Sequence, residues 1–523
     1  MGAIEAILMS GNGLRKRIRE YPWYTILFAV YPTVTLLAHN IGEVEASVAY
    51  RAIWVSGLVS LVLVLVGYLF FCDLKIAGVL TFLFLFGLFF YGHIYGYVRG
   101  WEVNGVILGR HTYFMVVWLG LLLILGWVIL RSKTIIDILP SFLSTVVIFL
   151  LALPVFQLVS YQFRTWQNSR KIVHPEISLP DQSVESYPDV YYIILDMYGR
   201  HDVLLDDFGY DDSPFLQELR DMGFYVAECG QSNYHSTAYS LSSVLNINYL
   251  PDISDRFSPD NMDTTLMWYL IQNSGVVESF KSLGYQVVAF ETGYRWTELQ
   301  DADHYYKLRS NGINDFENLL LRNSFASVFF ERGMVDRFRL TSDRRKHDLS
   351  IYVLDELEKV PLLAGPKFVF IHLTIPHPPY VMGPSGELEV VSPIYEGNES
   401  YYIEDEYKLG YINQVKYLNS RMPQVLKSIL ERSKQPPVII MQGDHGPRYV
   451  EIEKQVDILN AYYFPEPAPE PYPSISPINN FRMIFNTYFG ASLSLLPDWS
   501  YWARIETPFD LMEIPNDCVV NTE

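Results

Sequence analysis

The stretch SNYHSTAYSLSSVLN, residues 232–246, joins a short apolar run to a segment with helical spacing. The run Phe224–Ala227 before it is typical of a strand, and apolar residues recur at helical spacing from Leu241 onward. Ser236 and Thr237 are therefore predicted where a loop becomes a helix, beside unpaired backbone N–H groups and the positive end of the helix dipole. An oxygen there suits a phosphate site or a nucleophile, but it equally suits an ordinary helix cap.

The chain from Asp189 onward alternates strand-like and helical segments. Strands separated by helices predict a mostly parallel sheet with helices on both faces. Polar residues follow the carboxyl ends of the predicted strands, which is the edge where open α/β sheets bind their ligands. These residues are Asp196, Glu291, His377, Asp444 and His445.

Carboxylates, an imidazole and a hydroxyl are expected to meet at this edge. Asp196 ends one predicted strand, the pair Asp444 and His445 ends another, and a hydroxyl comes from a third loop. This donor set suits a divalent transition metal such as zinc or manganese, which would lower the pKa of the hydroxyl and offset charge on a phosphate or sulfate. Taken singly, each residue has an ordinary alternative, such as capping a turn or pairing within a loop.

Five long apolar runs precede residue 160, and each is long enough to cross a bilayer as a helix. The runs are about Trp23–Ile41, Ala52–Phe71, Ile76–Val98, Tyr113–Leu130 and Ile136–Val159. We therefore predict a transmembrane domain of five helices over residues 1–160, a linker over 161–188 and an α/β domain over 189–523.

Basic residues are concentrated on one side of the predicted spans. Several precede the first span, and later loops on that side hold Lys75, Arg131 and Lys133. The positive-inside rule places this side in the cytoplasm, and an odd number of spans then places Asp189 onward outside the cytoplasm. The first apolar run has no small-residue cleavage site, so we expect no removable signal peptide.

The net charge, the cysteines and the composition of the spans argue against several classes of function. A net charge of −19 argues against nucleic acid as a partner. Cys72 lies in a predicted cytoplasmic loop, while Cys229 and Cys518 lie in the outer part, where the sequence leaves open whether they pair. No cysteine spacing indicates a zinc knot. Few ionisable residues interrupt the spans, which disfavours a transporter.

Three motifs, in chain order, resemble the alkaline phosphatase superfamily. They are Leu195-Asp196, Thr237-Ala238-Tyr239-Ser240 and Gly443-Asp444-His445-Gly446, and the resemblance covers roughly residues 189–490. The outer domain resembles the sulfatase-like branch, and five spans followed by such a domain resemble lipoteichoic acid synthases and lipid A phosphoethanolamine transferases. The resemblance implies that Thr237 is the nucleophile and a metal ligand, and that Asp196, Asp444 and His445 complete the metal site.

The same resemblance implies four substrate-binding residues. His377, within IPHPPY, is similar to the family's substrate-side histidine, and the alternative is a turn residue held by prolines. Arg295 and Trp296 follow a predicted strand where such transferases hold phosphate and head group, although a surface Arg beside a packing Trp also fits. A guanidinium can bind phosphate through two hydrogen bonds, and Arg448 is a further candidate to reach the anion.

Two departures from the wider superfamily shape the expected chemistry. Formylglycine sulfatases need a Cys-x-Pro-x-Arg type motif, and the segment CGQSN at residues 229–233 lacks both Pro and Arg, which disfavours that mechanism. Two-metal members carry further histidines after the Asp-His pair, and residues 451–486 contain none. We therefore expect one divalent ion, manganese or zinc in the first place, with magnesium or calcium as alternatives.

The expected function is that of a membrane-anchored, metal-dependent transferase facing outward. Thr237 would attack a phosphodiester lipid donor, and an acceptor hydroxyl on a glycan or lipid would then displace the covalent phospho-threonine. The nearest alternative is a hydrolase of phosphate or sulfate esters on the same site. An alternative of another class is a non-catalytic membrane binding or structural protein, against which the intact Asp196, Thr237, Asp444 and His445 set argues.

Overall fold

A computed structural model of the protein divides by its contacts into two compact units. The first holds Met1–Arg164 with Gly312–Ser342, and the second holds Thr165–Asn311 with Asp343–Glu523. The structure describes residues 21–42, 44–103, 106–107, 109–169, 187–309, 312–331, 341–391, 394–396 and 399–519. The basic residues before the first span and most of the predicted linker lie outside the described residues. The predicted domain bounds stay predictions.

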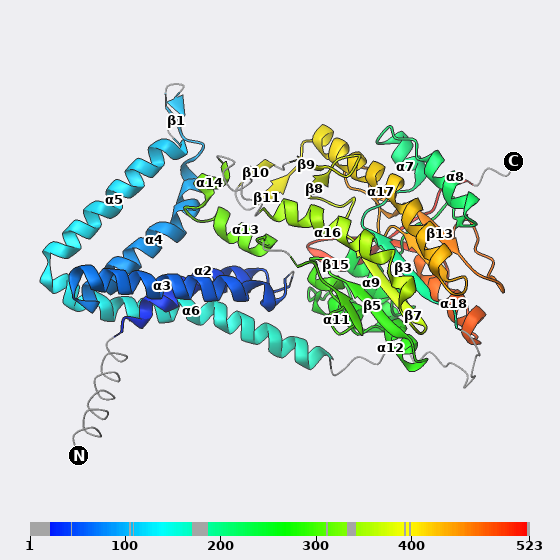
Figure 1. Cartoon of the computed structure of the whole chain (residues 1–523), viewed down its shortest axis with the longest axis horizontal. Coiled ribbons are helices and arrows are strands. Elements are labelled where there is room, and N and C mark those ends of the chain that lie inside the picture. The colour runs from blue at the N-terminus through cyan, green and yellow to red at the C-terminus, as the bar shows by residue number, and fades with distance from the viewer. Residues whose placement is uncertain are drawn as a thin grey trace, which may run out of the picture. The chain divides into compact units, whose positions relative to one another are not determined.

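The first unit contains a series of long apolar helices (Figure 1). Within the described residues, four are long and apolar enough to cross a membrane: α3 (Tyr50–Phe71, preceded by the 3-10 turn η1 at Ala46–Ala49), α4 (Leu74–Val98), α5 (His111–Arg131) and α6 (Lys133–Ser169). Helix α2 (Trp23–His39), in the first predicted span, has 17 residues and is about 25 Å long, which is shorter than a bilayer's apolar core. Five spans were predicted and four are confirmed, and α2 stays a prediction.

The candidate spans expose much of their apolar surface. The most apolar windows of α3, α5 and α6 are only 11%, 6% and 17% buried, and side chains such as Phe70 and Leu123 are 80% and 74% exposed. Apolar surface of this extent is expected where lipid surrounds a helix. Helix α6 also continues to Ser169, beyond the predicted end of its span at Val159.

A segment from later in the chain packs with these helices in the first unit. It contains two short helices, α13 (Asp315–Arg322) and α14 (Ser327–Glu331). Glu317 forms a salt bridge with Arg51 at the start of α3. The backbone N–H of Phe325 donates to the carbonyl of Leu88 in α4 at 2.7 Å. The segment lies within the range that the sequence assigns to the outer domain, and only its packing associates it with the apolar helices.

The second unit is built on a seven-stranded sheet of order β4-β13-β12-β3-β7-β5-β6. Strands β12, β3, β7, β5 and β6 are parallel, whereas β13 is antiparallel to both of its neighbours. The strands are β3 (Val190–Leu195), β4 (Tyr225–Val226), β5 (Gln286–Phe290), β6 (His304–Tyr306), β7 (Lys367–Leu373), β12 (Val438–Gln442) and β13 (Asn460–Tyr463). The predicted α/β domain with a mostly parallel sheet is confirmed.

Helices cover both faces of this sheet because its central strands are apolar on both faces (Figure 1). In β3, Tyr191 and Ile193 pack in one core, and Tyr192 and Ile194 pack in the other. Every residue of β3 is buried, as expected for a parallel strand between two helical layers. The first core includes α8 (Ser213–Asp221), α16 (Ser342–Leu357) and α17 (Glu404–Arg432), and the second includes α9 (Thr237–Val244), α12 (Gly275–Ser282) and α18 (Asn480–Phe489).

Shorter elements complete the described part of the second unit. The helices are α7 (His201–Asp206), α10 (Leu250–Ile253), α11 (Thr265–Gln272) and the 3-10 turns η2 (Arg295–Thr297), η3 (Val360–Leu362), η4 (Ile452–Val456) and η5 (Pro477–Asn479). The antiparallel hairpins are β8 (Tyr380–Met382) with β9 (Leu388–Val391), β10 (Ile394–Glu396) with β11 (Glu399–Tyr401), and β14 (Ser500–Arg504) with β15 (Thr507–Ile514). The sequence left open whether Cys229 and Cys518 pair, and in the structure a disulfide joins them. Cys72 is a free cysteine.

Candidate active site and metal centre

Asp196 and Asp444 meet at the carboxyl edge of the sheet because they follow adjacent parallel strands. Strand β3 pairs with β12 with Ile194 opposite Gln442, so the residues just after both strands lie at one edge. The chain turns sharply after Asp196, where Met197 has a φ of 68°, a left-handed conformation that is unfavourable for a residue with a Cβ. The turn brings the Met197 N–H within 3.0 Å of Asp444 Oδ1 and ties the two loops together.

A third ligand candidate, His372, lies inside β7, the strand on the other side of β3. Its Nε2 is 3.4 Å from Asp196 Oδ2, and one ligand atom from each of Asp196, His372 and Asp444 lies within 4.8 Å of the others. The sequence pattern directs attention to residues after strand ends and therefore misses His372. The signal that marks it is a single imidazole within a strand whose residues are all buried.

Three atoms of this cluster are buried and have no hydrogen-bond partner within the described residues. They are Asp196 Oδ1, Asp444 Oδ2 and His372 Nε2. Buried polar atoms are nearly always paired, since leaving one unpaired costs about 1–3 kcal/mol. A divalent cation would satisfy all three atoms, and carboxylate oxygens with an imidazole nitrogen are a donor set that zinc and manganese accept. The residues present therefore fit a metal ion.

His445 joins the cluster from the loop after β12. Its Nε2 lies 3.7 Å from Asp196 Oδ1 and 3.8 Å from Asp444 Oδ2. Its Nδ1 is 2.8 Å from the carbonyl oxygen of Gly446, which can only accept, so Nδ1 carries a hydrogen and Nε2 is the nitrogen that can bind a metal ion. The structure thus brings the predicted residues Asp196, Asp444 and His445 together and adds His372 to them.

The tautomer of His372 is set by two threonine hydroxyls behind it. Thr292 donates its hydroxyl to the carbonyl oxygen of Tyr294 at 3.1 Å, so its oxygen accepts from the hydroxyl of Thr297, 3.0 Å away. Thr297 in turn accepts from His372 Nδ1 at 2.9 Å, which fixes the hydrogen on that nitrogen. His372 Nε2 is left to bind either a metal ion or a second proton.

Charges within the cluster shift the pKa values of Asp196 and His372. Burial alone would raise the pKa of Asp196, but the imidazoles of His377, His372 and His445 outweigh burial and hold that pKa well below its ordinary value. Burial alone would lower the pKa of His372, yet the Asp196 carboxylate outweighs it and raises that pKa. Asp196 is therefore held in its ionised form, and a metal ion would compete with a proton for His372 Nε2.

Thr237 is the first residue of α9, at the loop-to-helix junction that the sequence predicts. Ser236 is the N-cap residue, but its side chain makes no capping hydrogen bond. Ser240 is buried and donates to the carbonyl of Tyr234 at 2.8 Å, so its hydroxyl is committed to the fold. Within the described residues the Thr237 hydroxyl makes no hydrogen bond, and it is partly exposed. The alternative in which Ser236 or Thr237 only caps the helix therefore lacks the side-chain hydrogen bond that a cap would make.

His235, in the loop before Thr237, is a buried histidine that the sequence pattern does not single out. Its ring lies 5.5 Å from that of Trp502. Burial lowers the pKa of His235 to about 3, with smaller contributions from the charges of Arg448 and His445.

His377 and Arg448 lie close enough to act electrostatically on the cluster. The charge of His377 lowers the pKa of Asp196, and its Nδ1 lies 3.1 Å from the hydroxyl of Tyr294. Burial lowers the pKa of Arg448, while the charges of Asp444 and Asp196 oppose that effect. The Arg448 side chain also donates to Gln455 Oε1 at 2.8 Å, which holds it in place.

Arg295 and Trp296 have strong packing roles in the structure. The guanidinium of Arg295 lies over the ring of Trp268 at 4.6 Å from its centroid. Trp296 is partly buried and packs against two apolar cores, both of which contain residues of α9. The substrate-binding role that the resemblance implies for these two residues stays a prediction.

Comparisons with known proteins give structural matches, while no family model and no curated protein matches the sequence. The C-terminal periplasmic domain of EcEptC from Escherichia coli is 12% identical with a TM-score of 0.42, covering 65% of this chain and 96% of that one. Lipooligosaccharide phosphoethanolamine transferase A (EptA) from Neisseria meningitidis is 12% identical with a TM-score of 0.39, covering 90% and 95%. The lipoteichoic acid synthase LtaP from Listeria monocytogenes is 11% identical with a TM-score of 0.37, covering 63% and 78%. EptA and LtaP carry the names of the two kinds of protein that the sequence resembles.

Proposed function

We propose that this protein is a membrane-anchored, metal-dependent transferase that moves a phosphorylated head group from a lipid donor to a glycan or lipid acceptor through a covalent intermediate on Thr237. The observation that carries the proposal is the set of three buried, unpaired ligand atoms of Asp196, His372 and Asp444. Helix α9 contributes the hydroxyl of Thr237, which makes no hydrogen bond within the described residues. A divalent ion held by this set and His445 would lower the pKa of the hydroxyl and offset charge on a phosphate.

The proposed reaction has two displacements at one phosphorus atom. Thr237 Oγ1 attacks the phosphorus of the donor, the bond to the lipid alcohol breaks, and the threonine proton leaves with that alcohol. An acceptor hydroxyl then attacks the same phosphorus, forms the product ester and returns its proton to Thr237. Arg448 and His377 are proposed to bind the phosphate oxygens, because Arg448 lies in the loop after Asp444 and His445 and His377 lies in the loop after β7.

The disulfide supports a site outside the cytoplasm. Bonds such as Cys229–Cys518 persist mainly in oxidising compartments, and the free Cys72 follows α3 in the loop that the basic residues assign to the cytoplasm. The candidate spans supply the anchor, since their exposed apolar faces need lipid around them. A site anchored at the outer membrane surface favours a lipid as donor.

Mass spectrometry of the peptide that contains Thr237 tests the proposal. The full-length, metal-loaded protein in detergent is incubated with phosphatidylethanolamine or phosphatidylglycerol, without acceptor, and quenched in acid. We expect an adduct on Thr237 whose mass equals the phosphorylated head group of the lipid supplied. Thr237→Ala should carry no adduct, and Ser240→Ala is the matched control that should keep it.

Two results would change the conclusion. Turnover of lipid by a protein whose Thr237 stays unmodified would contradict the covalent mechanism. Rapid release of the head-group phosphate into water, with no increase when an acceptor is added, would favour the hydrolase over the transferase.

A further inference from the structure

The loop of residues 229–236, just before the proposed nucleophile, lies against the end of the chain. The backbone N–H of Tyr501 donates to the carbonyl of Asn233 at 3.0 Å. The rings of Tyr234 and Tyr501 pack with their centroids 5.7 Å apart. We name residues 499–518, which include the hairpin β14–β15, the C-terminal brace.

The side chain of Asn233 joins the loop to the brace and to the turn before α18. It is fully buried. Its Nδ2 donates to the carbonyl of Trp499 at 2.9 Å and to Ser476 Oγ at 3.1 Å, and its Oδ1 accepts from the N–H of Ile478 at 2.9 Å. A side-chain amide that uses both its donor and its acceptor in a buried site holds the backbone in one position.

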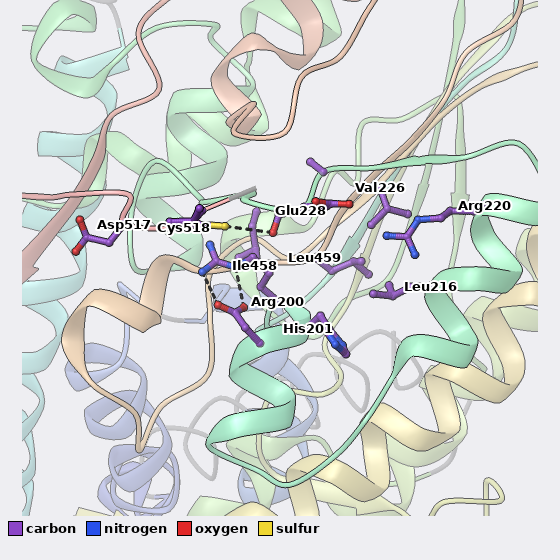
Figure 2. A pocket seen from close by; sticks show the side chains of 13 residues that line it. Arg200, His201, Leu216, Arg220, Val226, Glu228, Ile458, Leu459, Asp517 and Cys518 are labelled. Atoms are coloured by element: carbon purple, nitrogen blue, oxygen red, sulfur yellow. Dashed lines mark hydrogen bonds and ion pairs between the residues drawn. The ribbon is translucent and has the colours of Figure 1, made fainter. Parts of the chain in front are cut away.

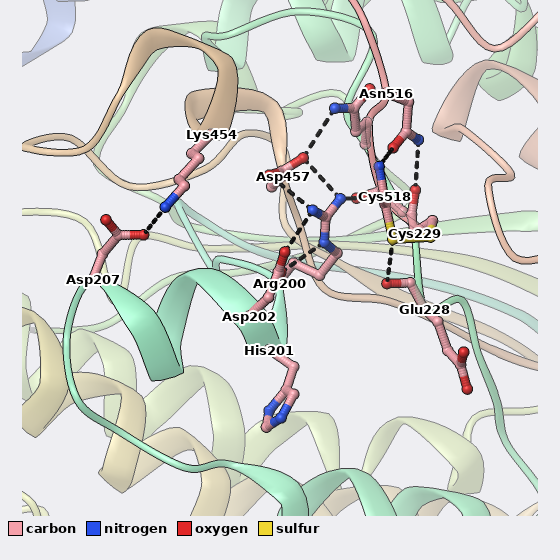
Figure 3. Close-up of polar contacts among 12 residues, drawn as sticks. Arg200, His201, Asp202, Asp207, Glu228, Cys229, Lys454, Asp457, Asn516 and Cys518 are labelled. Atoms are coloured by element: carbon pink, nitrogen blue, oxygen red, sulfur yellow. Dashed lines mark hydrogen bonds and ion pairs between the residues drawn. A yellow bond between two sulfur atoms is a disulfide. The ribbon is translucent and has the colours of Figure 1, made fainter. Parts of the chain in front are cut away.

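The far end of the brace is tied covalently to the start of the loop (Figure 3). The Cα atoms of Cys229 and Cys518 are 5.5 Å apart in the disulfide, and Asn516 Nδ2 donates to the carbonyl of Cys229 at 2.9 Å. Near the other end, the hydroxyl of Ser500 donates to the carbonyl of Ser232 at 2.8 Å. The loop is therefore fastened to the brace at both ends.

The metal-ligand cluster has a different support. Asp196, His372 and Asp444 extend from β3, β7 and β12, whose residues are all buried in the centre of the sheet. Thr237, in contrast, follows a loop that is hydrogen-bonded both to the brace and to residues 456–458 just before β13. A change in the brace can therefore move the hydroxyl while the ligand cluster keeps its geometry.

We propose that the C-terminal brace is a positioning element for Thr237 and that the Cys229–Cys518 disulfide clamps it in place. This inference rests on the proposed function, in which Thr237 is the nucleophile. A displacement of about 1 Å at a reacting group can cost about 10²-fold in rate, so loss of the clamp lowers turnover while metal stays bound. Asn233 and Ser500 are positioning residues in this arrangement, because they act through the loop.

A reductant can reach the Cys229–Cys518 disulfide through a cavity of about 540 Å³ that Cys518 helps to line (Figure 2). Arg200, Leu216 and Val226 line other parts of the same cavity. A thiolate that enters attacks the Cys518 sulfur, forms a mixed disulfide with it and releases Cys229 as a thiolate. The second thiol of a dithiol reagent then resolves the mixed disulfide, and the reagent is oxidised as the two cysteines are reduced.

The test compares the full-length protein in detergent with the double variant Cys229→Ser, Cys518→Ser. Cys72→Ser is the matched control, because it removes the chain's free cysteine. The measurements are zinc bound per chain, hydrogen exchange of peptides spanning residues 231–241, and kcat and KM for the phosphodiester probe bis(4-nitrophenyl) phosphate. In the double variant we expect unchanged zinc, faster exchange over 231–241, and kcat about 10²-fold lower with KM within about twofold. Dithiothreitol should produce the same pattern in the wild type and no further change in the double variant.

The outcomes separate this inference from the proposed function. Unchanged exchange over residues 231–241 together with unchanged kcat in the double variant would overturn the role of the brace. A wild type that binds zinc but does not turn over the probe, while exchange still accelerates in the double variant, would overturn the proposed function and uphold the brace as the support of this loop. If the double variant does not fold, Ser500→Ala keeps the disulfide and removes one buried hydroxyl. It should show the same pattern with kcat about tenfold lower, and wild-type kcat and exchange in it would overturn the inference.

Discussion

The imidazole of His372 illustrates how single hydrogen bonds prepare this site. Because Thr292 and Thr297 fix the hydrogen on Nδ1, the nitrogen that faces Asp196 is the one that can bind a metal ion. His445 reaches the same state through the carbonyl of Gly446. Two imidazoles are thus oriented by groups behind them, as metal ligands in proteins usually are.

Replacing Thr297 by valine should weaken metal binding. Thr297→Val keeps the shape of the side chain but leaves His372 Nδ1 without its acceptor, and loss of such an outer partner typically costs about 10–100-fold in metal affinity. Zinc titration against a competing chelator measures the change. Thr265→Val is the control, because it makes the same substitution at a threonine whose buried hydroxyl has no partner in the described residues. Equal affinities in the two variants would contradict the role given to Thr297.

Substitutions of the hydroxyl at residue 237 should separate a nucleophile from a helix cap. Thr237→Ala should lose several orders of magnitude in kcat, as removal of catalytic nucleophiles typically does. Thr237→Ser should keep partial activity, whereas Thr237→Asn, which can still cap a helix, should keep none. Steady-state rates on a phosphodiester decide the matter, with Ser240→Ala expected to stay active. A fully active Thr237→Asn protein would rule out the proposed nucleophile.

The acid sensitivity of the fold should depend on His235. Burial lowers the pKa of His235 to about 3 from its ordinary value of 6.5, so the unfolded chain takes up the proton first as the pH falls. This stability is fully present above pH 6.5 and is lost progressively toward pH 3, at up to about 1.4 kcal/mol per pH unit. Thermal unfolding midpoints at pH 6.5, 6 and 5.5 should therefore fall more steeply in the wild type than in His235→Gln. Parallel pH profiles in the two proteins would show that His235 is not held neutral.

At the scale of elements, the contact between α4 and the segment of α13 and α14 depends on a close backbone approach. A Cβ at Gly92 would lie 2.5 Å from the backbone of Asn323, whereas Gly96, one turn later on the same helix, has nothing within 4 Å of that position. The hydrogen bond from the Phe325 N–H to the carbonyl of Leu88 lies beside this approach. Gly92 therefore serves packing, and the segment needs it to reach α4.

Alanine at these two glycines should have opposite effects on stability. Gly96→Ala should be neutral or stabilising by up to about 1 kcal/mol, because Ala is the better helix former. Gly92→Ala gains the same propensity but meets backbone atoms that cannot move aside cheaply, so we expect a net loss of about 1–3 kcal/mol. Thermal unfolding in detergent measures both variants. Equal unfolding midpoints for the two variants would show that Gly92 of α4 does not lie this close to the backbone of Asn323.

At the scale of the whole molecule, the membrane spans and the disulfide give consistent indications of orientation. The basic loops place Lys75 and its neighbours in the cytoplasm, and the disulfide places Cys229 and Cys518 in an oxidising compartment. Three candidate spans, α4, α5 and α6, separate Lys75 from Cys229, and this odd number of crossings meets both conditions. Counting α2 (17 residues) as a further span also places the basic residues that precede it on the same side as Lys75.

Thiol labelling in intact cells should reveal this orientation. A membrane-impermeant maleimide should leave the protein unlabelled, because Cys72 faces the cytoplasm and the other two cysteines are bonded to each other. Labelling of Cys72 is expected only after the membrane is permeabilised. Labelling of Cys229 or Cys518 in intact cells is expected only after an impermeant phosphine has reduced them. Immediate labelling of Cys72 in intact cells would reverse the orientation.

The sequence by itself determined the features that repeat locally. Uninterrupted apolar runs predicted the spans, and alternating strands and helices predicted the parallel sheet. Because parallel strands end at one edge, the same pattern predicts that Asp196, Asp444 and His445 lie close together. Cap chemistry likewise placed Thr237 at the start of a helix.

Only the tertiary structure decided the contacts between residues that no local pattern links. His372 lies inside a strand, where an imidazole and a packing residue occupy the same kind of position, and its neighbour Thr297 is brought there by a separate turn. The disulfide joins cysteines separated by 289 residues, and the brace reaches the loop before Thr237 from the end of the chain. Such contacts depend on how whole elements pack, because the free energy that selects them is shared among many residues and leaves no period or motif in any one segment.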